Sequence, residues 1–528
     1  MKNWLPSSWL SSGLLFLPLF AFANDVSDAH ECLNIVDLAC AMKIRDQVLE
    51  GASKNEEVLQ LHARTLFHEG KYDEVVSVLE QLSELGVDVS DDGGFPARAT
   101  ASAAAGMVVK KGERVLVRHD PGLDQILAND GVNILESSRK TYDTLFGAGP
   151  DHDIVMDIFP TAVRFMAASG IPPEAVRNTG VIALSKWNRL LITSPRALAR
   201  GYAWQDTAAH EYIHLVVAWR SKDQAPVWLQ EGLAKYLEKA WRGERVDYLS
   251  VHQQSLLATA VKDDSFVPFE KFSRSMAYLD SGDEAALAFA QVATMIDFLQ
   301  QKAGDKVFPT LMERLAGGEK AEDAVANLAG YGSFYEFKSD WKKYIQTLPL
   351  VQEQLASAPI ALDGEGGDFA DDPLLSNRVD LEKFVRIGDL LFEKGYYGAA
   401  LIEYAKADDA DDMPSPNILA RQAQCLLEMK RNEEALKKLN RAQRLYPEHA
   451  LVLSTAAQYY EKEGQLQKAI EAWEAVHLVN PYDKNMQASL IRLYQKNGDI
   501  NKEKEHQMYL NILKAGGAIL SKGANNAE

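Results

Sequence analysis

The sequence predicts a multidomain protein in which an α+β domain with a mixed sheet precedes an all-α array of helical repeats. The chain has 528 residues, more than one compact domain usually contains. Between residues 110 and 350, short β-branched runs alternate with longer segments of helical periodicity. The C-terminal third instead repeats small residues every 34 or 35 positions, which is typical of stacked helix pairs.

Changes in composition and periodicity set the expected domain boundaries. They are a signal peptide (1–23), a helical, repeat-like segment (24–92), a linker (93–109), the α+β domain (110–350), an acidic linker (351–379), the repeats (380–516) and a tail (517–528). The net charge of −19 argues against a nucleic-acid partner, because such proteins need basic surfaces to neutralise phosphates.

The α+β domain shows strand and helix patterns before its most distinctive motif. Residues 113–117 and 154–159 have the composition of strands, and residues 132–146 that of a helix. Residues 179–184 and 189–193 flank a short polar run that includes Trp187 and Asn188, so we expect a hairpin there.

Regular spacings organise the C-terminal third. Gly395, Lys430, Gly464 and Gly498 follow one another at intervals of 35, 34 and 34 residues. Ala400, Ala435 and Ala469 recur at intervals of 35 and 34, and Pro447 and Pro481 are 34 residues apart. This period with helix-turn-helix punctuation is typical of tetratricopeptide repeats. About four repeats fit, enough to bury a continuous core, and we expect them to bind protein partners.

The N-terminus predicts export. An apolar run from Leu14 to Ala23 ends in Ala21-Phe22-Ala23, a cleavage signal of the A-x-A type. No later run is long enough to span a bilayer, so we expect no transmembrane segment in the mature chain. The expected location is the periplasm of a Gram-negative bacterium or the medium.

The three cysteines fit an exported protein. Cys32 and Cys40 lie close in sequence and are able to pair in an oxidising compartment. Cys425 lies on a periodic apolar face, where we expect a buried core thiol.

The most informative stretch is H-E-Y-I-H, residues 210–214, followed by W-L-Q-E-G from residue 228. On a helix, His210 and His214 share one face and can bind one zinc ion, while Glu211 lies where it can take a proton from water. Glu231, in the first turn of a second helix, is a credible third ligand because a carboxylate in an apolar setting needs a partner. Asp206 is the expected N-cap of the first helix.

With sixteen residues (215–230) separating H-E-Y-I-H from the glutamate of W-L-Q-E-G-L-A-K-Y-L-E, residues 110–345 resemble the gluzincin metallopeptidases. The shorter spacing and the upstream N-T-G-V-I-A-L are similar to the bacterial peptidase MA-like branch. The resemblance implies a zincin-like catalytic domain with one Zn²⁺ bound by His210, His214 and Glu231. It also implies Glu211 as the general base and gives Glu238 a place at the end of the Glu231 helix.

The resemblance leaves the donor that stabilises an oxyanion open. Related chains often have an aromatic hydroxyl where this one has Phe289. Tyr236 and Tyr278 are substitute candidates, and Glu238 is a further candidate for supporting the ligands. The G-x-M-E-N loop of the aminopeptidase branch is absent from the sequence, which favours an endopeptidase.

Three functions remain in competition. The first is an exported zinc endopeptidase that acts on a protein or peptide substrate recruited by its repeats. The alternative is a catalytically inactive, peptidase-like scaffold that binds proteins through the repeats. The third is a zinc hydrolase that cleaves a non-peptide bond, such as a cell-wall amide.

Overall fold

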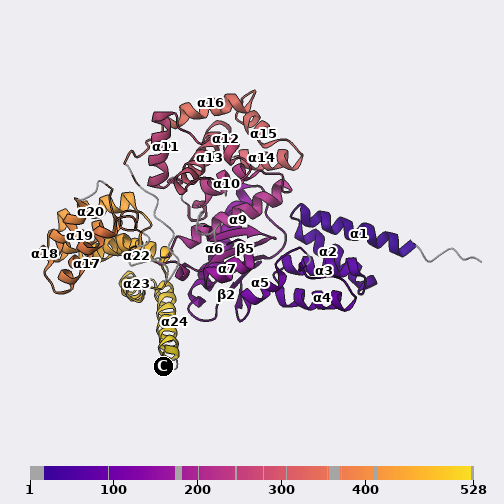
Figure 1. Cartoon of the computed structure of the whole chain (residues 1–528), viewed down its shortest axis with the longest axis horizontal. Coiled ribbons are helices and arrows are strands. Elements are labelled where there is room, and N and C mark those ends of the chain that lie inside the picture. The colour runs from indigo at the N-terminus through magenta and orange to yellow at the C-terminus, as the bar shows by residue number, and fades with distance from the viewer. Residues whose placement is uncertain are drawn as a thin grey trace, which may run out of the picture. The chain divides into compact units, whose positions relative to one another are not determined.

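The computed structural model describes residues 17–92, 94–172, 181–199, 201–243, 247–276, 279–304, 306–353, 355, 369, 372–409 and 413–524. The chain divides into two compact units, Met1–Ala101 and Ser102–Glu528, and Figure 1 labels most of their elements. The division falls inside the expected linker 93–109, but that segment is ordered, because it contains α5 (Ala97–Ala104) and the start of β1. Residues 1–16 of the expected signal peptide and most of the expected acidic linker lie outside the described residues.

The first unit is built from helix pairs. Its helices are α1 (Leu17–Asn34), α2 (Leu38–Ala52), α3 (Glu56–His68) and α4 (Tyr72–Glu84). A disulfide between Cys32 and Cys40 joins α1 to α2, so the two cysteines do pair. The buried side chains Ala29, Leu38 and Leu61 share one apolar cluster, as the repeat-like pattern of this segment predicts.

The second unit begins with a five-stranded mixed sheet in the order β1-β2-β3-β5-β4. Its strands are β1 (Val108–Lys111), β2 (Val115–His119), β3 (Ile154–Phe159), β4 (Ala183–Lys186) and β5 (Arg189–Thr193). The three central strands are parallel, whereas β1 and β4 are antiparallel edges. Because side chains alternate along a strand, Met156 packs on one face of the sheet and Phe159 on the other.

Two local conformations explain where the strands begin and end. The β4–β5 hairpin turns at Trp187 and Asn188, which both have positive φ, as a two-residue type I′ turn requires. β2 begins two residues later than expected, because Arg114 also has positive φ (64°) and belongs to the turn after β1. The antiparallel pairing of β1 with β2 was not evident from the sequence.

Helices cover both faces of the sheet. α6 (Gln125–Ser138), which starts earlier than expected and continues into a π-helical turn (Arg139–Asp143), lies with α9 (Trp204–Ser221) on one face, and α7 (Ala162–Ser169) on the other. Figure 1 shows α9 beside the strands. The chain continues through α10 (Val227–Leu237), α11 (Val251–Asp263), α12 (Phe269–Phe272), α13 (Gly282–Ala303), α14 (Val307–Ala316), α15 (Ala321–Leu328) and α16 (Phe334–Ile345).

The C-terminal helices form four consecutive pairs, which confirms the predicted fold class. They are α17 (Val379–Glu393) with α18 (Tyr397–Asp408), α19 (Pro416–Glu428) with α20 (Asn432–Leu445), α21 (Ala450–Lys462) with α22 (Leu466–Val479), and α23 (Lys484–Asn497) with α24 (Ile500–Ala524). Gly395, Lys430, Gly464 and Gly498 follow the first helix of each pair, and all four have positive φ. The spacing seen in the sequence therefore marks a left-handed turn that favours glycine.

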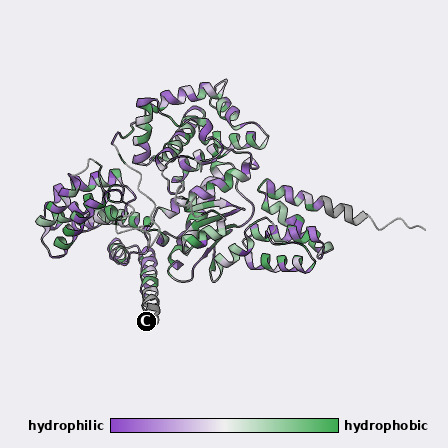
Figure 2. Cartoon of the chain, viewed as in Figure 1, coloured by the Kyte–Doolittle hydropathy of each residue, from purple (hydrophilic) through white to green (hydrophobic). Residues whose placement is uncertain are grey.

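The strands of the sheet and the helices of the repeats differ in hydropathy. Figure 2 shows largely hydrophobic strands, whereas the repeat helices alternate between hydrophobic and hydrophilic stretches. Cys425 is buried, as expected for a core thiol. Among the described residues, no helix is both long and apolar enough to cross a membrane.

Candidate metal centre

The candidate site lies between α9 and α10. Pro226 precedes α10, because its fixed φ suits a helix start and it lacks an N–H that would need a partner. Gly232 lets α10 approach α13 closely, since a Cβ there would lie 3.0 Å from the Val292 carbonyl oxygen. This contact fixes the helix turn that carries Glu231 over the centre of α9.

Asp206 has a different role from the expected N-cap. α9 begins at Trp204, so Asp206 lies inside its first turn, 4% exposed. Its carboxylate accepts hydrogen bonds from Trp241 and Arg242 instead. Burial raises the pKa of Asp206 to about 6, although Arg242 and Trp241 oppose the shift.

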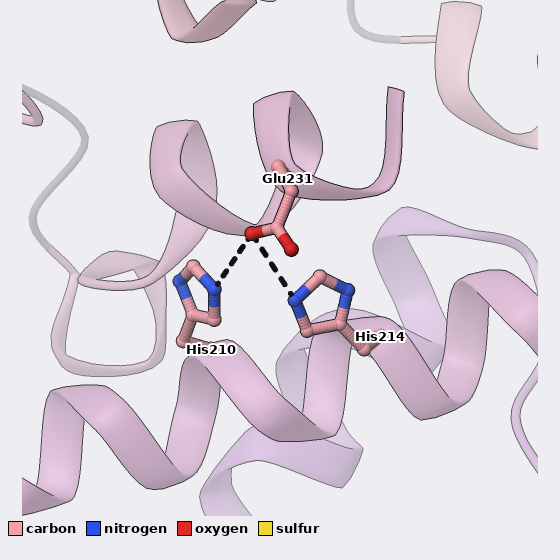
Figure 3. Close-up of side chains that lie close together, drawn as sticks. All are labelled: His210, His214 and Glu231. Carbon is pink, nitrogen blue, oxygen red and sulfur yellow. Dashed lines mark ion pairs between the residues drawn. The ribbon is translucent and has the colours of Figure 1, made fainter. Parts of the chain in front are cut away.

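Three side chains from the two helices converge on one point, as Figure 3 shows. Oε2 of Glu231 lies 3.5 Å from Nε2 of His210 and 3.5 Å from Nε2 of His214. All three ligand atoms lie within 4.8 Å of one another. Tetrahedral zinc with bonds of about 2.1 Å separates its ligand atoms by about 3.4 Å, so the donor set and its spacing fit Zn²⁺.

The electrostatics of the site also favour a cation. Burial alone lowers the pKa of His210, but hydrogen bonds to Glu231 and Glu238 raise it to about 10. Burial alone raises the pKa of Glu231, but His214 and His210 outweigh it and hold that pKa far below its usual range. Without a metal, a proton on the His210 ring must balance these carboxylates, and a divalent cation can replace that proton.

Glu238 holds His210 from behind. Its Oε2 lies 3.1 Å from Nδ1 of His210, which leaves Nε2 directed at Glu231. Lys235 donates to the other Glu238 oxygen at 2.5 Å. Burial alone raises the pKa of Glu238, but Lys235 and His210 lower it to about 2. A carboxylate on the second imidazole nitrogen fixes the tautomer and raises the basicity of a ligating histidine.

Glu211 lies beside the three convergent side chains and is only 7% exposed. Burial raises its pKa above the ordinary value, against the opposing charges of His214 and His210. The backbone N–H of Ser185, on edge strand β4, donates to this carboxylate. A carboxylate with a raised pKa, held by one N–H, is suited to accept a proton near neutral pH.

The described oxyanion candidates are engaged elsewhere. The Tyr236 hydroxyl donates to Gln300 at 2.6 Å and lies 3.4 Å from Asp297. Phe289 is half-buried and packs against the main apolar cluster. Tyr278 lies outside the described residues. The identity of an oxyanion donor therefore stays a prediction.

Two supporting groups escaped the sequence analysis. Lys235 stands three residues before Glu238, a spacing that allows a helical ion pair, so the sequence did contain a signal for it. The Ser185 N–H contributes through its backbone and reaches Glu211 only because β4 is the sheet edge beside α9. No pattern of residues in the sequence predicts that contact.

Comparison with known protein families identifies the same part of the chain. The sequence model of the Peptidase MA superfamily matches residues 140–347, which include α9 and α10. No curated protein matches the sequence significantly.

Solved structures are similar to this chain only distantly. Yeast LTA4 hydrolase in complex with bestatin is 14% identical over 77% of this chain and 67% of that chain, with a TM-score of 0.31. MamA is 19% identical over 28% of this chain and 85% of that chain, with a TM-score of 0.23. The APC/C hetero-tetramer Cut9–Hcn1 is 12% identical over 94% of this chain and 81% of that chain, with a TM-score of 0.25. At these levels, functional reasoning depends on the site residues and on the family match.

Proposed function

We propose that this protein is an exported zinc-dependent metallopeptidase, an endopeptidase that binds one Zn²⁺ per chain through His210, His214 and Glu231. The observation that carries the proposal is the convergence of these three donors at tetrahedral spacing, with the Glu211 carboxylate buried beside them. When bound, zinc supplies a Lewis acid that lowers the pKa of water and polarises a carbonyl.

The residues of the chain divide the remaining work. Glu211 takes a proton from the attacking water and passes it to the leaving amine, which its raised pKa favours. Ser185 holds the Glu211 carboxylate through its N–H, and Glu238 holds the His210 ring. The buried setting strengthens these interactions because little water competes with them.

Edge strand β4 supports an endopeptidase reading. Among the described strands β4 pairs with β5 alone, and Ser185 connects it to Glu211. An extended peptide that added a strand to this edge would pass beside the general base. Such pairing uses backbone groups of the substrate and needs no free terminus.

The proposal is tested by comparing the wild type with Glu211→Gln on a mixed peptide library. We expect the variant to lose about 10²–10⁴-fold in turnover, because a carboxamide cannot take the proton. Glu313→Gln, which changes an exposed carboxylate in the same domain, serves as the matched control and should cleave normally. Equal turnover by Glu211→Gln and the wild type would refute the proposal.

The scaffold alternative has one specific observation in its favour. The Tyr236 hydroxyl is bound to Gln300, and Phe289 has no hydroxyl, so neither offers a free donor for an oxyanion. In that case the zinc site would be structural and the repeats would carry the function. Stoichiometric zinc with no cleavage of any library peptide would support it.

Export to an oxidising compartment is part of the proposal. It is supported by the apolar N-terminal run that ends in Ala21-Phe22-Ala23 and by the disulfide between Cys32 and Cys40. Sequencing the N-terminus of protein recovered from the periplasm or medium tests it. A start at Asn24 is expected, and recovery only from the cytoplasm with an intact leader would contradict it.

A further inference from the structure

The first repeat, formed by α17 and α18, exposes apolar residues at positions that are buried in every later repeat. Ile387 and Leu390 on α17 are 44% and 58% exposed. The corresponding residues, one repeat length apart each time, are all buried, namely Gln422, Cys425, Ala456, Tyr459, Leu490 and Leu493. In those repeats the preceding helix pair covers the positions. Among the described residues no helix pair of the array precedes the first repeat, so this face is where another helix would stack.

Two lysines bracket the apolar pair, Lys383 on α17 and Lys394 at its C-cap. Lys383 precedes Ile387 by four residues, and Lys394 follows Leu390 by four, which places all of them along one side of the helix. We call these four residues the first-repeat face. Neither lysine forms an ion pair with a described residue, whereas Glu382 and Asp389 on the same helix pair with Arg386 and Arg421.

A solvent-exposed end of a repeat array normally carries polar residues. Lys383 meets that requirement. The equivalent positions of the later repeats have the apolar residues Ile418, Val452 and Met486. Ile387 and Leu390 do not meet it. Elsewhere in the same pair, Tyr396 and Ile402 are each 61% exposed, and the later repeats have charged or polar residues at both places. Exposed apolar side chains thus gather in the first repeat.

We propose that the first-repeat face binds an amphipathic helix of a protein partner, with acidic residues at both ends of a short apolar stretch. The spacing of the face sets the partner pattern as Glu-x-x-x-Leu-x-x-Leu-x-x-x-Glu, with Asp or another aliphatic residue acceptable. Its two acidic groups stand eleven residues apart, about 16 Å along a helix, and match Lys383 and Lys394. The inference deepens the recruiting role that the sequence predicts for the repeats and does not require the metal site to be active.

Charge disfavours a second copy of this chain as the occupant. An antiparallel pairing of two α17 helices centred on Ile387 and Leu390 would set Lys383 of one copy opposite Lys394 of the other. Like charges in that arrangement repel each other, whereas two acidic residues on a partner helix would attract both lysines.

The test measures fluorescence anisotropy of a synthetic helical peptide that carries the acidic pattern, titrated with the full chain. A second peptide has lysine in place of both glutamates. We expect the acidic peptide to bind roughly tenfold more tightly than the lysine peptide. The double variant Ile387→Asp/Leu390→Asp should lose binding, while Ile500→Asp, at an equally exposed apolar residue on α24, should keep it.

Charge reversal makes the test specific. Lys383→Glu/Lys394→Glu should bind the lysine peptide in preference to the acidic one, a rescue that misfolding cannot produce. Equal binding of both peptides by the wild type, or unchanged binding by the double aspartate variant, would overturn the proposal. So would a wild-type dimer in sedimentation that Leu390→Asp splits, because the face would then pair with itself.

These outcomes are separable from the peptidase proposal. Glu211→Gln should bind the acidic peptide as the wild type does, and the first-repeat variants should hydrolyse library peptides at the wild-type rate. Loss of binding without loss of cleavage identifies failure of the docking face alone.

Discussion

The helix pair α9–α10 and the helix pair α17–α18 depart from ordinary packing in opposite ways. The first directs ionisable side chains at one another in a largely buried place, whereas the second turns aliphatic side chains toward water. Buried polar groups and exposed apolar groups are the two informative exceptions to the usual partition of residues. In both regions the chain alone leaves the arrangement incomplete.

The difference teaches what each region lacks. The Glu231 carboxylate already contacts the rings of His210 and His214, but the centre still favours a divalent cation over a proton. Ile387 and Leu390 have no such internal compensation, and only another apolar surface can remove them from water. Loss of a ligand should therefore damage the first region severely, and truncation of a side chain should hardly affect the stability of the second.

The largest expected effect is at the metal centre. Glu231→Ala removes one of three donors, and we expect the purified protein to lose its stoichiometric zinc. Metal analysis after dialysis measures this directly. The conservative Glu231→Asp should retain part of the zinc, since its carboxylate is shorter but still a ligand. Full zinc retention by Glu231→Ala would remove this residue from the ligand set.

Matched leucines in the repeats give the next largest effect. Leu493 is 2% exposed and Leu390, at the corresponding position of the first repeat, is 58% exposed. We expect Leu493→Ala to cost about 3 kcal/mol and Leu390→Ala less than about 0.5 kcal/mol in chemical denaturation. Similar costs for both variants would show that something already covers Leu390.

Glu238 should have an intermediate effect. Because it orients His210 without joining the ligand set, Glu238→Gln should weaken zinc binding about 10–100-fold while leaving the fold intact. Competition with a chelator measures the affinity, and circular dichroism checks the fold. An unchanged affinity would assign Glu238 to ordinary helix-end packing.

The smallest effect concerns pH and the contact of the last repeats with α6. His477, buried near Glu474 and His506, lies 2.9 Å from Asp130 on α6. Burial alone lowers the pKa of His477, but Asp130 raises it above the ordinary value. A raised histidine pKa stabilises the folded state fully below about pH 6.5, and this contribution disappears as pH rises through the folded pKa.

Thermal unfolding should therefore begin at a lower temperature at about pH 9 than at about pH 6. Lys502 opposes the charge on His477, so the dependence should be modest. His477→Gln keeps a donor for Asp130 but does not titrate, and its unfolding temperature should vary less with pH. The same pH dependence in both proteins would assign it to other groups.

The sequence located the candidate ligands because they lie on two neighbouring helices. His210, His214 and Glu231 are close along the chain, and helical periodicity alone aligns the two histidines. The turns of the repeats were visible for a similar reason, since a left-handed conformation selects glycine at a fixed interval.

Contacts between distant segments were not visible. The Ser185 N–H reaches Glu211 through the order of strands in the sheet, and the first half of β1 fell in an expected linker. The exposure of Leu390 depends on what precedes its repeat in space, because the same pattern is buried in later repeats. Asp206 was misassigned because Trp241 and Arg242, over thirty residues away, decide its role.

The most direct measurement is a zinc titration of chelator-treated protein with peptide hydrolysis followed at each point, for the wild type and Glu211→Gln. The account predicts that wild-type activity rises linearly and stops at one zinc per chain. Glu211→Gln should take up the same zinc and remain inactive. Zinc uptake without hydrolysis by the wild type, or equal hydrolysis by both proteins, would contradict the claim that the convergent polar residues of α9 and α10 form a catalytic metal centre.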